Sequence, residues 1–278
     1  RYLCEALGER TSSVLGLTLN YDQLDNRIRP TRGQQASVTV DYAGLGGDVS
    51  YAKVRANASK FWPVGGGFIF SVRGEGGYIK GFSDYDEDGD NDVLLTDRFF
   101  LGEPQIRGFD IRGVGPRVIR QPIIADPDSP DPNNPQPLVI TDRDRVTDDA
   151  LGGEAYYLAR AELEIPLGSG ASELGLRPSI FVDAGAVFGV ETPQLASSPF
   201  GNEIFIPRRD EDGNPLYFVD GDPDVTTDDV TVAVPDGSPI PAGGVALGNS
   251  LPAFQEIFVG DSAKPRVAVG VGVNWNSP

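Results

Sequence analysis

Two sets of side chains in this sequence could carry chemistry, and the first is a run of acids. Aspartates alternate through an acidic stretch at Asp84, Asp86, Asp88, Asp90 and Asp92. Carboxylate oxygens at this spacing can converge on a calcium ion. The twelfth position counted from Asp84 is Leu95, where an EF-hand needs a bidentate glutamate, and no helical pattern flanks the run. The stretch predicts either a weak calcium site or a solvated acidic loop, and no other cofactor is expected.

The second set joins an arginine to distant carboxylates. Glu162, Glu164 and Asp183 resemble paired acids for general acid–base catalysis, but the chain has no histidine and a single cysteine. These counts exclude a histidine-based triad and a zinc site, and no nucleophile accompanies the acids, so we predict no enzymatic activity. An electrostatic role is the alternative, because Arg107 offers a planar fork that can bind a carboxylate through two hydrogen bonds.

The elements that would position these groups alternate in polarity with a period of two. Seven such segments lie near residues 15–21, 36–42, 52–58, 68–75, 157–165, 180–188 and 266–275. Each has one apolar face and one face of polar, small or charged side chains, as expected of half-buried strands. A soluble sandwich would show the same alternation. Mixed charges on the polar faces and aromatic side chains at the strand ends favour a membrane barrel with a water-filled interior.

The connections between these segments differ greatly in length. Short turns near 22–34, 64–67 and 166–176 alternate with a tight turn at 44–47 and two long loops, 81–153 and 190–264. Outer-membrane barrels have short periplasmic turns and longer extracellular loops, so we place the two long loops outside. The first loop holds 16 acidic and 7 basic residues and the second holds 13 and 3, which together carry essentially all of the net charge of −18. This charge argues against a nucleic-acid partner.

The predicted fold class is all-β. We expect about seven strands of a transmembrane antiparallel β-barrel, with residues 1–278 forming one partial barrel domain and the two acidic loops on its extracellular side. No run of about 18 consecutive apolar residues suggests a transmembrane helix.

Several short motifs resemble the barrel domain of the BamA family, within the POTRA–barrel (bacterial surface antigen) superfamily of outer-membrane proteins. They are GLTLNYDQLDN at 16–26 with PTRG at 30–33, AGLGGD at 43–48, IRGF at 106–109 with GVGP at 113–116, FVDAG at 181–185 and GVNWNSP at 272–278. The resemblance implies a sixteen-stranded barrel, of which these strands would be the eighth to the fourteenth. The other strands and the periplasmic POTRA repeats would lie outside this chain.

The resemblance also implies a role for the loop motif. In the family this loop folds into the barrel lumen, where its arginine meets carboxylates on the inner wall. The motif corresponds here to Ile106, Arg107, Gly108 and Phe109. The matching carboxylates are Glu164 and Asp183, both on the polar faces of their segments. Arg107 would be either a structural clamp or a part of the working cycle.

The function implied by the resemblance is the folding and insertion of β-barrel proteins into the Gram-negative outer membrane. The partners would be nascent barrel proteins, outer-membrane lipid and accessory lipoproteins bound through the POTRA repeats. A polypeptide-secretion transporter of the same superfamily is a second hypothesis. An acidic, calcium-binding surface protein with a soluble β-sandwich is a third, and solubility without detergent would favour it over both membrane hypotheses.

Overall fold

The computed structural model describes residues 9–84, 93–167, 176–195, 203–219, 230–235, 238–240 and 244–275. These ranges contain strands, turns and loops, and in them no helix is long and apolar enough to cross a membrane. The chain divides into two compact units. The first comprises residues 1–118, 149–194 and 258–278, and the second comprises residues 119–148 and 195–257.

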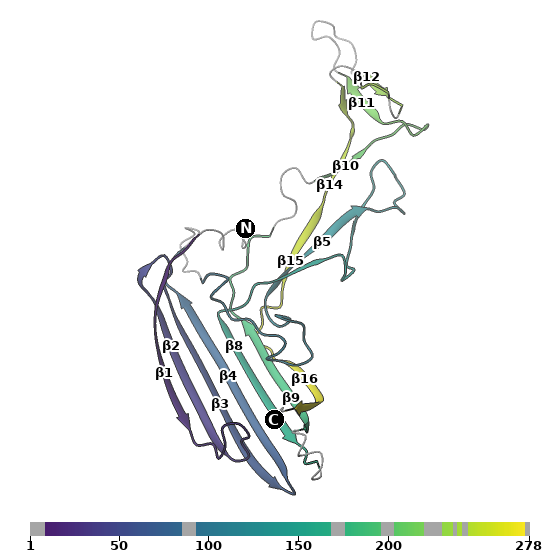
Figure 1. Cartoon of the computed structure of the whole chain (residues 1–278). Helices are drawn as coiled ribbons and strands as arrows, with labels where there is room; N and C mark the ends of the chain where they lie inside the picture. The colour runs from purple at the N-terminus through teal and green to yellow at the C-terminus, as the bar shows by residue number, and fades with distance from the viewer. Residues whose placement is uncertain are drawn as a thin grey trace. The chain divides into compact units, whose positions relative to one another are not determined.

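The first unit is built on one seven-stranded antiparallel sheet (Figure 1). In order across the sheet, its strands are β1 (Ser12–Asp22), β2 (Gly33–Gly47), β3 (Tyr51–Gly65), β4 (Phe68–Gly81), β8 (Ala155–Glu164), β9 (Leu176–Phe188) and β16 (Arg266–Trp275). All seven correspond to segments predicted from the alternation, and most extend a few residues further. Their order across the sheet is their order along the chain, as in a barrel wall built from consecutive strands.

The pairing register places apolar residues opposite apolar residues and polar residues opposite polar residues on neighbouring strands. The sheet therefore has one apolar and one polar face, which is why the alternation in the sequence predicts its strands. On the apolar face, Val40 of β2 pairs with Leu17 of β1 and with Val54 of β3. On the polar face, Thr39 of β2 pairs with Thr18 of β1, and the two hydroxyl oxygens lie 3.1 Å apart. A slip by one residue would move the apolar side chains of a strand to the opposite face.

The apolar face of this sheet is open along its described strands. Leu17 on β1 is 64% exposed, Val271 on β16 is 80% exposed, and Val182 on the inner strand β9 is still 42% exposed. A soluble sandwich would bury such side chains beneath a second sheet. An exposed apolar band on the outside of a curved sheet is instead what lipid-facing barrel strands present.

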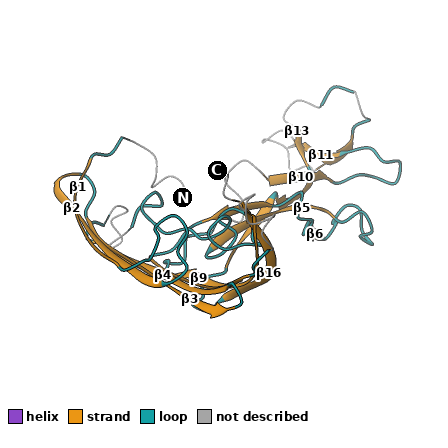
Figure 2. Cartoon of the chain, turned by 60° about the horizontal axis from the view of Figure 1, so that its bottom comes forward, coloured by secondary structure: helices purple, strands orange, loops and turns teal. Residues whose placement is uncertain are grey.

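Loop segments of the first unit lie on the concave side of the sheet (Figure 2). The contact of Arg107 in the loop with Asp183 identifies this side as the polar face. One cluster of buried apolar side chains anchors the beginning of the 81–153 loop to the ends of the first strands. It consists of Ala43, Val49, Tyr51, Ile79, Val93, Leu94 and Phe99. Tyr156 packs against this cluster, with its ring 4.7 Å from that of Phe99. The beginning of the 81–153 loop is therefore packed against the seven-stranded sheet, which forms the wall of the barrel.

Side-chain hydrogen bonds fix the connection between β1 and β2, at residues 23–32. Asp25 accepts hydrogen bonds from the Thr31 hydroxyl at 2.5 Å and from the Thr31 and Arg32 backbone amides. These bonds, the Thr31 hydroxyl first among them, lower the pKa of Asp25 from 3.8 to about 2. This turn and the one at 66–67 lie at the end of the sheet opposite the two long loops, as predicted. Within the turn expected near 166–176, residues 168–175 lie outside the described residues.

The two long loops contain sheet structure of their own. Their strands are β5 (Arg117–Ala125), β6 (Pro137–Val139), β7 (Thr147–Ala150), β10 (Glu203–Pro207), β11 (Leu216–Val219), β12 (Val230–Ala233), β13 (Gly244–Ala246), β14 (Gly248–Pro252) and β15 (Phe254–Val259). Strand β5 pairs with β15, β6 and β7, β10 pairs with β14, and β11 pairs with β12 and β13. Between β5 and β15, Arg120 binds the buried carboxylate of Glu256 at 2.6 Å. The predicted single barrel domain with two long loops did not anticipate this second compact unit.

Candidate functional site

The loop motif at residues 106–109 lies against the polar face of the sheet. Ile106 is fully buried in a cluster that joins the loop to β8 and β9. The cluster consists of Leu101, Ile106, Val114, Leu158 and Val187. Phe109 is half-buried and packs against the same side chains. Apolar contacts on both sides of Arg107 therefore hold the motif on the wall before any charge is considered.

The backbone of this loop folds back on itself. The Ile106 N–H donates to the Gly102 carbonyl at 3.0 Å, and the Val114 N–H donates to the Leu101 carbonyl at the same distance. Gly108 has a φ of 81°, a conformation that strains any other L-residue. The glycine in the motif thus lets the chain turn immediately after Arg107.

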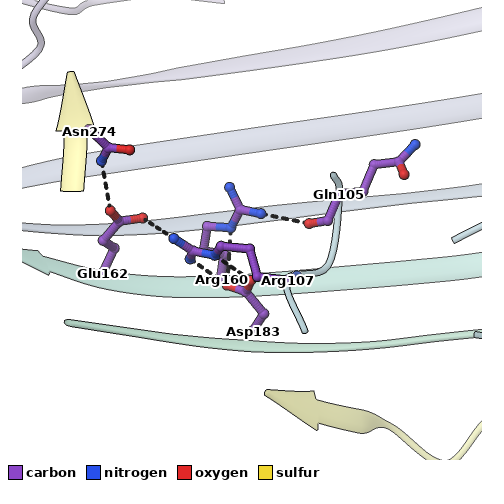
Figure 3. A network of polar contacts seen from close by, with 6 residues as sticks. All are labelled: Gln105, Arg107, Arg160, Glu162, Asp183 and Asn274. Carbon is purple, nitrogen blue, oxygen red and sulfur yellow. Dashed lines mark hydrogen bonds and ion pairs between the residues drawn. The ribbon is translucent and has the colours of Figure 1, made fainter. Parts of the chain in front are cut away.

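The Arg107 guanidinium binds Asp183 of β9 through two parallel hydrogen bonds (Figure 3). Its Nε donates to Oδ2 and its Nη2 donates to Oδ1, both at 2.8 Å, and the Arg107 backbone N–H donates to Oδ2 at 3.2 Å. Asp183 is fully buried. A buried carboxylate is stable only when charge and hydrogen bonds compensate its lost hydration. The structure thus brings together Arg107 and Asp183, the first predicted pair.

The third guanidinium nitrogen reaches a different carboxylate from the one predicted. Arg107 Nη1 donates to Oε2 of Glu162 at 3.3 Å (Figure 3). Glu164 lies two residues further along β8, where its Oε2 accepts a hydrogen bond from Arg177 Nη1 at 2.9 Å. The prediction that Glu164 binds Arg107 is therefore wrong, although Glu164 does lie on the polar face.

The position of the arginine along the sheet explains this correction. The Arg107 guanidinium stacks over Phe181, with its carbon 3.3 Å from the ring centroid. In the β8–β9 register, Phe181 pairs with Glu162, whereas Glu164 pairs with Ser179. Two residues along a strand correspond to about 6.6 Å, so an arginine centred on Phe181 reaches only the nearer glutamate.

Two further side chains complete the network. Arg160 of β8 pairs with Asp183 in the sheet, donates from Nε to Asp183 Oδ1 at 3.1 Å, and donates from Nη2 to the Gln105 carbonyl at 2.6 Å. Asn274 of β16 donates to Glu162 Oε1 at 3.1 Å (Figure 3). Two arginines thus face two carboxylates, and the network joins the loop to three strands.

Comparison with known proteins shows the family to which this chain belongs. The Omp85 superfamily domain matches residues 3–278, nearly the whole chain. The chain belongs to the Omp85 superfamily.

Two curated relatives and one crystal structure illustrate this Omp85 relationship. The outer membrane protein assembly factor BamA of Neorickettsia risticii (strain Illinois) is 30% identical over 185 residues, which are 66% of this chain and 20% of that protein. The SAM50-like protein CG7639 of Drosophila melanogaster is 29% identical over 110 residues, 39% of this chain and 24% of that protein. The crystal structure of BamA from Haemophilus ducreyi lacking POTRA domains 1–3 aligns with 92% of this chain and 42% of its own, at a TM-score of 0.48 and 20% identity. The matched regions thus span about a quarter or less of the curated relatives.

The predicted cation site can be placed only in part. Asp84 is described, whereas Asp86, Asp88, Asp90 and Asp92 lie outside the described residues. In the part of the chain that the structure describes, no group of three or more histidine, cysteine, aspartate or glutamate side chains is placed to hold a metal ion. Calcium binding by the acidic run stays a prediction.

Charge as well as packing holds the docked loop of this Omp85 chain. Burial by itself would lower the pKa of Arg107, but the hydrogen bonds and charge of Asp183, followed by those of Glu162, raise it overall. Arginine is in any case protonated throughout the pH range of folded proteins. The arrangement can therefore position the loop, and titration of Arg107 cannot release it.

Sequence reasoning missed Arg160 and Asn274 as members of the site, and of the two glutamates on β8 it named Glu164 and not Glu162 as the partner of Arg107. Glu162, Arg160 and Asn274 all lie on the polar faces of segments that the alternation identified, so the sequence indicates which face of the sheet they occupy. The missing information was the register between β8 and β9, which places Arg160 opposite Asp183. Charge balance could have indicated Arg160, because two carboxylates around one arginine leave one negative charge without a counter-charge.

Proposed function

We propose that the protein containing this chain is an outer-membrane assembly factor, which folds and inserts β-barrel proteins into the Gram-negative outer membrane. The chain would supply consecutive strands of its barrel together with two extracellular loops. The observation that carries this proposal is the 30% identity over two thirds of the chain with a protein named as an outer membrane protein assembly factor. The exposed apolar face of the sheet supports a location in lipid.

The docked loop fits this activity as an internal brace. An assembly factor of this type would present a sheet edge to which client strands add through backbone hydrogen bonds, so that no covalent bond is made and no cofactor is needed. Such an edge is useful only if the rest of the wall keeps its shape. The contacts from Arg107 to Asp183 and Glu162 join a loop to two adjacent strands. We propose that this bracing keeps the wall competent while clients pair elsewhere.

The proposed partners follow from the same assignment. Clients would be nascent outer-membrane barrel proteins, and outer-membrane lipid would surround the apolar face of the sheet. Accessory lipoproteins would bind POTRA repeats outside this chain. The two acidic loops would face the exterior of the cell.

The test is an Arg107→Ala substitution in the full-length protein, in cells that depend on it. The abundance of other folded outer-membrane barrel proteins should fall, because the wall loses its brace. Arg177→Ala is a matched control, because Arg177 is 25% exposed against 26% for Arg107 and binds the carboxylate of Glu164 on the same face. Normal assembly of other barrels by Arg107→Ala protein at an unchanged level would overturn the proposed role of the loop.

A further inference from the structure

We propose that Arg160 is a second positioning residue for the docked loop, because it contacts both the carboxylate that binds Arg107 and the loop that carries Arg107. It holds the carboxylate that receives Arg107, and it holds the loop backbone two residues before Arg107. The proposal goes beyond the assembly function, because it concerns how the loop is fixed and holds whether or not the protein assembles barrels.

The geometry of Arg160 is that of a bridge. Its Nε donates to Asp183 Oδ1 at 3.1 Å, and its Nη2 donates to the Gln105 carbonyl at 2.6 Å (Figure 3). One rigid guanidinium plane therefore fixes the distance between the wall and the loop. Asp183 Oδ1 also accepts from Arg107 Nη2, so one carboxylate oxygen serves both arginines.

Electrostatics indicates that this arginine is more than a surface charge. Its cross-strand neighbour on β4 is Arg73, and like charges directly opposite each other destabilise a sheet. Arg160 is only 20% exposed, so water screens this repulsion incompletely. The network offsets the cost, because Asp183 and Glu162 carry two negative charges that Arg107 alone cannot balance. Removing Arg160 leaves one buried negative charge in excess beneath the loop.

The space around Arg160 makes a clean substitution feasible. A cavity of about 290 Å³ lies beside the loop on the polar face, lined in part by Arg73, Glu75, Gln105 and Arg160. Water can occupy a polar cavity of this size when a shorter side chain is introduced. Arg160→Gln is therefore expected to weaken docking without leaving a dry void in a packed core.

The experiment measures loop release by limited trypsin digestion of the full-length, detergent-solubilised protein, with cleavage sites identified by mass spectrometry. The Arg107–Gly108 bond can be cut only when Arg107 leaves Asp183 and enters the protease. Charge-assisted hydrogen bonds of this kind change an equilibrium by about ten- to a hundredfold. We expect Arg160→Gln to accelerate cleavage at this bond by about tenfold or more, and Arg177→Gln to leave the rate unchanged. Equal rates for Arg160→Gln and the unsubstituted protein would overturn the proposal.

A lysine variant separates bridging from charge. Arg160→Lys keeps the positive charge, but a single ammonium nitrogen cannot reproduce the planar fork that spans Asp183 and the Gln105 carbonyl. Cleavage at Arg107–Gly108 should be clearly faster than in the unsubstituted protein. Full protection of the loop in Arg160→Lys would show that charge alone suffices and would overturn the bridge.

If Arg160→Gln fails to fold, a charge-balanced variant replaces it. Arg160→Gln combined with Glu162→Gln removes one charge of each sign and keeps one amide oxygen, which can accept from either Arg107 or Asn274. The bridge to Gln105 is still lost, so loop cleavage should remain faster than in Glu162→Gln alone, and equal cleavage would refute the proposal. Because the readout is the loop itself, normal assembly of other barrels by an Arg160 variant with a released loop would count against the proposed bracing by the loop and not against this role of Arg160.

Discussion

Replacing Arg107 by lysine tests whether geometry or charge holds the loop. The guanidinium donates three side-chain hydrogen bonds, two to Asp183 and one to Glu162, and stacks on Phe181. A lysine keeps the charge but offers one nitrogen, so it loses at least the second bond to Asp183 and the planar stacking. A charge-assisted hydrogen bond contributes about 1.5–3 kcal/mol, and a partly desolvated cation–π contact about 0.5–2 kcal/mol. Because the ammonium recovers part of this, we expect docking to weaken by about 2–4 kcal/mol, or roughly 30- to 900-fold in the equilibrium.

Hydrogen exchange monitored by mass spectrometry or NMR can measure this change directly. The backbone N–H of residue 107 donates to Asp183, and that of Ile106 donates to the Gly102 carbonyl, so both amides exchange only when the loop opens. In Arg107→Lys both should exchange faster by the factor above, while the amides of β3 serve as an internal control. Acceleration of less than about threefold would show that apolar packing and charge suffice, and would refute the argument from the bidentate contact.

Two further predictions concern the second carboxylate and the first turn. Glu162→Gln should accelerate cleavage at the Arg107–Gly108 bond several-fold in the trypsin assay. Glu164→Gln should not, because Glu164 pairs with Arg177. The reverse order of the two cleavage rates would show that Glu164 is the partner of Arg107 after all. The folded pKa of Asp25 lies below its ordinary value, so the stabilisation of this turn is complete above pH 3.8 and is lost as the pH falls through about 2. Carbonyl chemical shifts should show Asp25 titrating near pH 2, and Thr31→Val should move the midpoint upward, because the Thr31 hydroxyl contributes most; an unchanged midpoint would contradict this origin.

The sheet was predictable because apolar residues recur at every second position of a strand that has one apolar face, which shows how the strand is oriented. Leu15, Leu17 and Leu19 share one face, and the intervening Gly16 and Thr18 share the other, so β1 could be recognised without knowledge of its neighbours. The short turns then required each strand to pair with the next. Local signals therefore determined the faces, the antiparallel order and the side from which the long loops leave.

The choice between Glu162 and Glu164 could not be made in the same way. Both occupy the polar face of β8, and alternation treats positions i and i+2 as equivalent. The choice depends on how far along the strand the loop docks, which is set by the burial of Ile106 and by Phe181 beneath the guanidinium. Ile106 lies more than 50 positions from Leu158 on β8, and Arg107 lies more than 70 positions from Phe181 on β9, so no local pattern reports these contacts.

The second unit escaped prediction for a related reason. Its strands are three to nine residues long, and several, such as β6 (Pro137–Val139) and β13 (Gly244–Ala246), are too short to display any period. They are stabilised by pairing between segments far apart in the chain, as in the contact of Arg120 on β5 with Glu256 on β15, 136 residues away. High acidity and many prolines made both loops resemble solvated segments.

The hydrogen bond from Asn274 to Glu162 has a consequence for how this wall comes apart. It connects β16 to β8 and bypasses β9, which lies between them. Peeling β16 away from β9 therefore also removes a partner from the carboxylate that binds Arg107. Strand attachment at that border and loop docking act on the same carboxylate. By reciprocity, whatever free energy the attachment of β16 contributes to docking, docking contributes equally to the attachment of β16.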